Sequence, residues 1–121
     1  MEYPTLDLLA REGEEAACSA ASKAENVDFA DHNECVKFDS VVRHVEGLMD
    51  TVFKVACVLA KHADDLESTA DIWKRVTKAC DAVLECMAKF ADKYPQCCGN
   101  YTYDRVLDWR NEAQERLNLH S

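Results

Sequence analysis

Residues 38–60 read FDSVVRHVEGLMDTVFKVACVLA, and this stretch decides the fold of the chain. Its apolar residues recur at alternating steps of three and four, which indicates an amphipathic helix. The main series is Phe38, Val41, Val45, Leu48, Val52, Val55 and Leu59, flanked by Val42, Met49, Ala56 and Ala63. The stripe is wider than the narrow seam of a coiled coil, which is typical of a helix in a bundle core.

The start of this helix is marked by a capping pattern. Asp31 is followed three residues later by Glu34, as in a capping box. We therefore expect the helix to run from about residue 32 to about residue 62.

A second apolar series predicts another long helix, over about residues 69–94. Its members are Ile72, Val76, Ala79, Val83, Cys86 and Phe90, with Trp73, Cys80, Met87 and Tyr94 on the same side. Ser68 lies three residues before Asp71 and is the expected N-cap. Pro95 disfavours helical geometry at the residue before it, so we expect the helix to end there.

The segment between these helices, residues 63–68, is open to two interpretations. The clustered Asp64, Asp65 and Ser68 favour a tight turn, which would fold the helices into an antiparallel hairpin. The helical register also continues straight through Leu66, however. A continuous rod would bury its stripe only by dimerising, so the width of the stripe favours the hairpin.

Two shorter helices complete the expected fold. Thr5, behind Pro4, can cap a helix over about residues 6–24, and Asn100 or Thr102 can cap one over about residues 103–117. We therefore predict an all-α chain in which residues 1–121 form a single domain, a four-helix up-and-down bundle. The alternatives are a long coiled-coil hairpin and a dimeric coiled coil.

Composition disfavours nucleic acid and membranes as partners. The 23 acidic residues outnumber the 14 basic ones, and the net charge of -9 repels a phosphate backbone or an anionic lipid surface. The sequence contains no stretch of membrane-spanning length and no secretory signal. The seven cysteines are an odd number and several fall within helical patterns, so we expect reduced thiols in the cytoplasm or nucleus.

The sequence lacks the patterns that support catalysis or cofactor binding. With three glycines it has no phosphate-binding loop, and its histidines, His32, His44, His62 and His120, are never three or four residues apart. We therefore expect a protein that is not an enzyme and has neither a cofactor nor a metal site.

One alternative function is histidine phosphotransfer, with His44 as the residue that carries the phosphoryl group. Histidine phosphotransfer domains are four-helix bundles with an exposed helix histidine, and the chain resembles them in size and class. Their signature places a basic residue and then Gly at the third and fourth positions after the histidine. Here those positions are Gly47 and Leu48, which removes the cation that would stabilise a phosphoryl group.

Cys97 and Cys98, beside Gly99 in a polar break, suggest a second alternative: thiol or metal chemistry. Adjacent cysteines point in different directions, and no second pair with zinc spacing occurs, so exposed or structural thiols are the simpler interpretation.

The favoured prediction is a helical module for protein–protein interaction or assembly, which binds a helical partner or a second copy. Aromatic residues and arginines crowd the junction before and within the last helix, and these residue types often carry binding energy at interfaces. The candidate partner-binding residues are Trp73, Tyr101, Tyr103, Arg105 and Trp109. The alternative for Trp73 and Trp109 is burial in the core.

Overall fold

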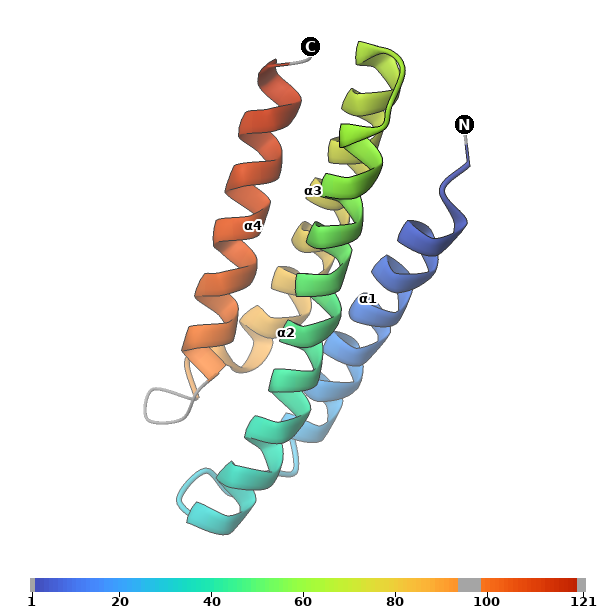
Figure 1. Ribbon diagram of the computed structural model, residues 1–121. Coiled ribbons are helices and arrows are strands. Elements are labelled where there is room, and N and C mark those ends of the chain that lie inside the picture. The colour runs from blue at the N-terminus through green and yellow to red at the C-terminus, as the bar shows by residue number, and fades with distance from the viewer. Residues whose placement is uncertain (1, 94–98, 120–121) are drawn as a thin grey trace.

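Four helices make up the computed structural model, which describes residues 2–93 and 99–119. They are α1 (Pro4–Ala24), α2 (His32–Lys61), α3 (Leu66–Ala91) and α4 (Gly99–Leu119). Successive helices run in opposite directions (Figure 1). The described residues include no strand. The predicted all-α four-helix bundle is confirmed.

The long helices α2 and α3 form the centre of the bundle. Each of them contacts the other three helices, whereas the described residues of α1 and α4 make no contact with each other. Figure 1 shows α1 and α4 on opposite sides of the central pair. The order around the bundle is therefore α1, α2, α4, α3, so the seam between α1 and α3 lies across from the seam between α2 and α4.

Two pairs of aromatic rings join α2 to α3. Phe38 and Phe90 meet edge to face, with 5.2 Å between ring centroids, and Phe53 lies 5.6 Å from Trp73. The first pair joins the start of α2 to the end of α3, and the second lies nearer the turn, as an antiparallel hairpin requires. The predicted hairpin is thus confirmed, and the continuous rod is not the structure that the chain adopts.

Asp31 caps α2 as predicted, although Glu34 does not complete the capping box, because its carboxylate accepts the backbone N–H of Asp28 and the Asp31 N–H donates to the Asp28 carbonyl. Asp31 accepts hydrogen bonds from the backbone N–H groups of Asn33 and Glu34, at 2.9 and 3.3 Å.

The cap of α3 is not the predicted one. Ser68 was the expected cap of α3, but the helix begins at Leu66. The reason is Asp65, which has extended backbone geometry and accepts the Ser68 N–H at 2.6 Å, so that Ser68 lies inside the first turn.

The outer helices also begin earlier than predicted. Thr5 does not cap α1, because the helix starts at Pro4, where the missing N–H of proline removes no helical hydrogen bond. Neither Asn100 nor Thr102 precedes α4, which starts at Gly99. Thr102 is instead buried within the helix, and its hydroxyl donates to Glu46 Oε1 at 3.2 Å.

Small side chains let α1 approach α2 closely. Buried residues on the inner side of α1 include Gly13, Ala17, Ala20 and Ala21. A Cβ atom added to Gly13 would lie only 2.7 Å from Met49 Sδ, whereas one added to Gly47, on the exposed side of α2, would meet nothing within 4 Å. A side chain at Gly13 therefore requires the buried Met49 side chain to shift, whereas one at Gly47 has open space.

We predict opposite effects of alanine at the two glycines. Gly47→Ala will raise the free energy of unfolding by about 1 kcal/mol, because alanine favours the helix and has room there. Gly13→Ala will lower it by about 1 kcal/mol, because overpacking costs roughly 1–3 kcal/mol and exceeds the gain in helix propensity. Urea denaturation at low protein concentration measures both, and equal changes in the two variants would contradict this account of the packing.

The Asp65 cap predicts a pH dependence of stability. The hydrogen bond from the Ser68 backbone N–H, with a further one from its hydroxyl, holds the pKa of Asp65 below its ordinary value of 3.8. A carboxyl whose pKa is lower in the folded state stabilises the fold above the unfolded-state pKa, and this contribution is lost as the pH falls through the folded-state pKa.

Asp65→Asn keeps a capping side chain but removes this titration. We expect the urea midpoint of the wild type to exceed that of Asp65→Asn at neutral pH, and the difference to shrink below pH 3.8. A difference that stays constant with pH would show that the charge of Asp65 does not contribute to capping.

Candidate functional site

The five predicted partner-binding residues lie in different environments. Tyr101, near the start of α4, is 55% exposed, whereas Trp73 is 1% and Trp109 9% exposed. Tyr103 and Arg105 are half-buried. Of these five residues, Tyr101 presents most of its side chain to solvent, while the two indoles belong to the core.

Arginines cover both indole rings. The guanidinium carbon of Arg116 lies 4.8 Å from the ring centroid of Trp73, and that of Arg105 lies 4.8 Å from the ring centroid of Trp109. Arg116 also reaches α2, where its Nη1 lies 3.8 Å from Cys57 Sγ. These arginines therefore shield aromatic surface from water by cation–π contact, and Arg116 also pairs with the exposed Glu112 of α4 at 2.8 Å.

The charged residues of α2 are sorted by sign. All of its basic residues are exposed and all of its acidic residues are half-buried; they are Lys37, Arg43, Lys54 and Lys61, and Glu34, Asp39, Glu46 and Asp50. The exposed set of α2 also includes His32 and His44. The outward surface of α2, which we call the basic face, is therefore cationic on a chain whose net charge is -9.

Intrahelical ion pairs maintain this arrangement. Arg43 pairs with Asp39 and Lys54 with Asp50, each at 2.8 Å and each four residues apart. In the second pair the lysine side chain is 73% exposed and the aspartate 33% exposed. The acidic partner thus lies toward the flank of the helix while the basic partner extends into solvent, where it remains accessible to a second anion.

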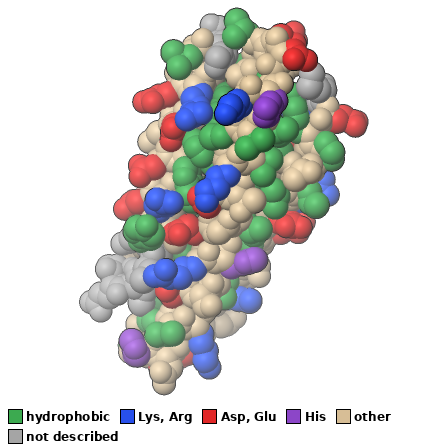
Figure 2. Space-filling model, viewed as in Figure 1, with side chains coloured by type: hydrophobic (Ala, Val, Ile, Leu, Met, Phe, Trp, Pro, Cys, Tyr) green, Lys and Arg blue, Asp and Glu red, His purple; other side chains and the backbone are tan. Residues whose placement is uncertain are grey.

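Charges on α4 are sorted in the opposite way. Its acidic residues Asp104, Asp108, Glu112 and Glu115 are exposed, while its arginines Arg105, Arg110 and Arg116 are half-buried. Arg110 pairs with Asp81 of α3 at 3.0 Å, and the other two cover the indoles. The outward surface of α4, the acidic face, is visible along one edge of the molecule in Figure 2, with Lys and Arg over the front of α2.

The second half of α2 exposes an apolar side chain next to these charges. Lys54 is the single polar residue in positions 52–60. A helix that is apolar on all sides is normally buried, yet Val58 is 58% exposed, and Val55 and Leu59 are only half-buried. This part of α2 therefore retains apolar surface that the bundle does not cover.

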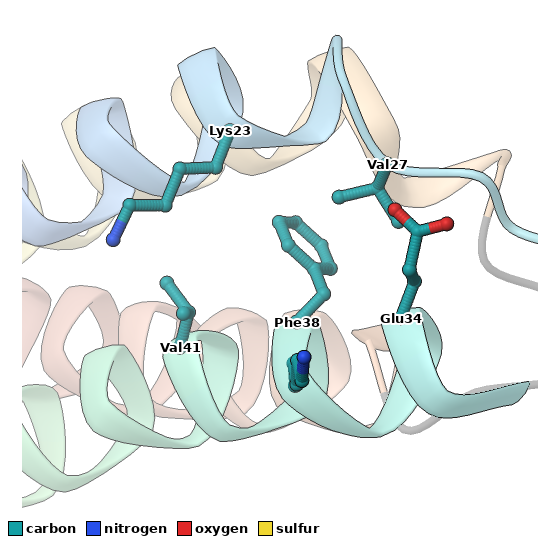
Figure 3. Close-up of a pocket in the computed structure, with 6 residues that line it drawn as sticks. Lys23, Val27, Glu34, Phe38 and Val41 are labelled. Carbon is teal, nitrogen blue, oxygen red and sulfur yellow. The ribbon is translucent and has the colours of Figure 1, made fainter.

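A groove between α1 and α2 contains an apolar hollow near the basic face. Figure 3 shows Val27, Phe38 and Val41 pointing into it, with Lys23 and Glu34 at its rim. A neighbouring hollow shares Lys23, Lys37 and Val41 and is also lined by Ala16, Ser19, Ser40 and His44. His44 therefore lies in the same hollow as two lysines.

These lysines were not found by sequence reasoning, which looked for a cation in the residues that directly follow His44. Lys23 comes from α1, and Lys37 lies two helical turns before His44. The pairing of α1 with α2 brings Lys23 to His44, so local spacing could not reveal it, whereas Lys37 could have been found from the helical repeat.

The remaining candidates concern metals and thiols. Cys97 and Cys98 lie outside the residues that the structure describes. Among residues 2–93 and 99–119, no three His, Cys, Asp or Glu side chains are grouped so as to hold a metal ion. None of the helices in these ranges is long and apolar enough to cross a membrane.

No family model, curated protein or solved structure matches this chain.

The candidate site consists of the basic face of α2, the acidic face of α4 and the apolar surface around Val58.

Proposed function

We propose that the protein is a non-enzymatic assembly module that binds a second copy of itself, with the basic face of α2 packed against the acidic face of α4. The observation that carries the proposal is the opposite sorting of charge on these two helices. Complementary charges across an interface favour the correct partner and increase the rate of association.

The arrangement of the helices suits a symmetric pair. α2 and α4 contact each other and run in the same direction (Figure 1). A two-fold axis parallel to them would place α2 of each copy opposite α4 of the other. The interface would then contain the same contact twice, and in each the basic face of α2 would pack against the acidic face of α4.

Exposed apolar side chains would supply the non-polar part of the interface. Val58 of α2 is 58% exposed, and Tyr101 and Leu119, near the two ends of α4, are 55% and 80% exposed. Such residues are needed because exposed ion pairs alone contribute at most about 1 kcal/mol each. Tyrosine is also one of the residue types that most often carry binding energy.

Charge exchange tests the pairing directly. One variant combines Arg43→Glu, Lys54→Glu and Lys61→Glu, and the other combines Asp104→Lys, Asp108→Lys and Glu115→Lys. Each variant alone brings like charges together, so we expect its dimer dissociation constant to rise at least about tenfold in sedimentation velocity.

Mixing the two variants restores opposite charges at both contacts, and we expect a one-to-one complex with affinity close to that of the wild type. Circular dichroism controls for the fold of each variant. A wild type that stays monomeric at all concentrations, or variants that fail to recombine, would contradict the proposed self-association.

Two valines on α2 provide a matched test of the apolar contribution. Val36 and Val58 are 56% and 58% exposed, so Val36→Asp and Val58→Asp disturb the monomer to a similar extent. We expect Val58→Asp to weaken the dimer at least about tenfold, because a buried unpaired charge is costly. Val36 lies ten residues before Glu46, which accepts a hydrogen bond from Thr102 in the first turn of α4, so in this pairing Val36 extends beyond the start of α4 and Val36→Asp should leave the dimer nearly unchanged. Equal effects in light-scattering measurements would exclude the surface around Val58 from the interface.

A second candidate function, phosphoryl relay through His44, is favoured by the two lysines that line the same hollow. Their ammonium groups can stabilise a phosphoryl group, as the missing basic residue of the sequence signature would. In this reaction a His44 ring nitrogen attacks the phosphorus of an acyl phosphate. The bond between phosphorus and the acyl oxygen breaks, the carboxylate leaves, and the ring loses a proton to solvent.

Incubation with acetyl phosphate tests this second candidate. We expect acid-labile phosphate on the wild type, its loss in His44→Gln, and a severalfold slower reaction in Lys23→Ala and Lys37→Ala. His32→Gln and His62→Gln are matched controls, since both histidines are also exposed. Labelling that persists in His44→Gln would exclude the relay.

A further inference from the structure

Two cysteines from different helices lie in direct contact. Sγ of Cys18, on α1, is 2.6 Å from Sγ of Cys86, on α3, although 68 positions separate them in the chain. The other described cysteines have different neighbours: Cys35 donates to the Phe29 carbonyl, Cys57 lies beside Arg116, and Cys80 is buried. The two thiol sulfurs are therefore in direct contact.

The two thiols differ in access to solvent. Cys18 is exposed and Cys86 is 8% exposed. A surface hollow beside them is lined by Cys18 together with Lys89 and Lys93, so a small polar molecule can reach the Cys18 sulfur near two cationic side chains. The Cys18 sulfur is therefore at the surface, where it can attack a small molecule, and the Cys86 sulfur is buried beneath it.

Burial raises the pKa of Cys86 to about 11, and its hydrogen bond with Cys18 acts in the same direction, while the charge of Lys89 opposes both. Cys86 is therefore held as a thiol that shares a hydrogen bond with Cys18. It is suited to react second, once Cys18 has been oxidised.

We propose that Cys18 and Cys86 form an oxidation site, at which a hydroperoxide converts the two thiols into a disulfide that joins α1 to α3. The Cys18 thiolate attacks the peroxide, the O–O bond breaks, and Cys18 becomes a sulfenic acid while one oxygen leaves as water after protonation. Cys86 then loses its proton and attacks the Cys18 sulfur, and the S–O bond breaks to release a second water. Two thiols and one hydrogen peroxide thus give one disulfide and two waters.

The disulfide would join α1 and α3 covalently along the seam that lies across the bundle from α2 and α4. Because it closes a loop that contains the whole of α2, it restricts the unfolded chain and raises the resistance of the protein to denaturant. It requires neither self-association nor phosphoryl transfer, so its test is independent of the proposed functions.

Hydrogen peroxide is the probe for the full-length chain. We expect near-stoichiometric peroxide to remove two free thiols, to lower the intact mass by two hydrogen atoms, and to give a Cys18–Cys86 linked peptide in non-reducing peptide maps. The urea midpoint should rise after oxidation and return to its starting value after dithiothreitol.

Serine variants separate this site from the other cysteines. Because Cys18 is exposed, Cys18→Ser removes one sulfur without disturbing the core, and it should abolish both the linked peptide and the rise in midpoint. Cys57→Ser, at a half-buried cysteine away from this contact, should preserve both effects. A linked peptide that joins other cysteines, or Cys18 oxidised to sulfinic acid with Cys86 still a thiol, would overturn the proposal.

Discussion

The reversal of the chain between α2 and α3 is the constraint on which the rest of the structure depends. The Phe38–Phe90 and Phe53–Trp73 ring contacts hold the two long helices in antiparallel register, and Asp65 begins α3 after a short turn. Each of the outer helices then packs on both central helices, while α1 and α4 do not contact each other. The bundle is therefore a central hairpin with one helix attached on either side.

This arrangement explains why the charges of α2 are sorted. Between its contacts with α1 and α4, α2 keeps a strip of its surface in solvent along its length. Long basic side chains can extend from that strip, whereas the shorter acidic side chains lie toward the flanks, where Arg43, Lys54 and Thr102 provide partners. On α4 the arginines turn inward because aromatic rings and Asp81 are available to them there. The two faces of opposite charge thus arise from the packing itself.

The hydrophobic pattern was sufficient to predict four helices and the hairpin. Apolar residues spaced three and four apart lie on one side of a helix, and that side must be buried against other helices. Helix starts were less predictable, since Asp65 and Ser68 are both good capping residues and only backbone geometry distinguishes them. The role of Trp73 depended on whether another side chain covered it, and Arg116, from a helix far along the chain, does so.

Contacts between distant segments were beyond sequence reasoning. The approach of Lys23 to His44 and the Cys18–Cys86 contact each depend on how α1 is placed against its neighbours, which local spacing does not encode. The sorting of charge on α2 and α4 could have been found by plotting each helix around its apolar stripe.

The most direct test of the central hairpin is a nuclear Overhauser measurement between its aromatic rings. In a sample where isotope-labelled chains are diluted into unlabelled ones, the account predicts contacts within one chain from Phe38 to Phe90 and from Phe53 to Trp73. Contacts seen only between chains, or their absence, would mean that α2 and α3 do not fold back on each other, and would contradict the account.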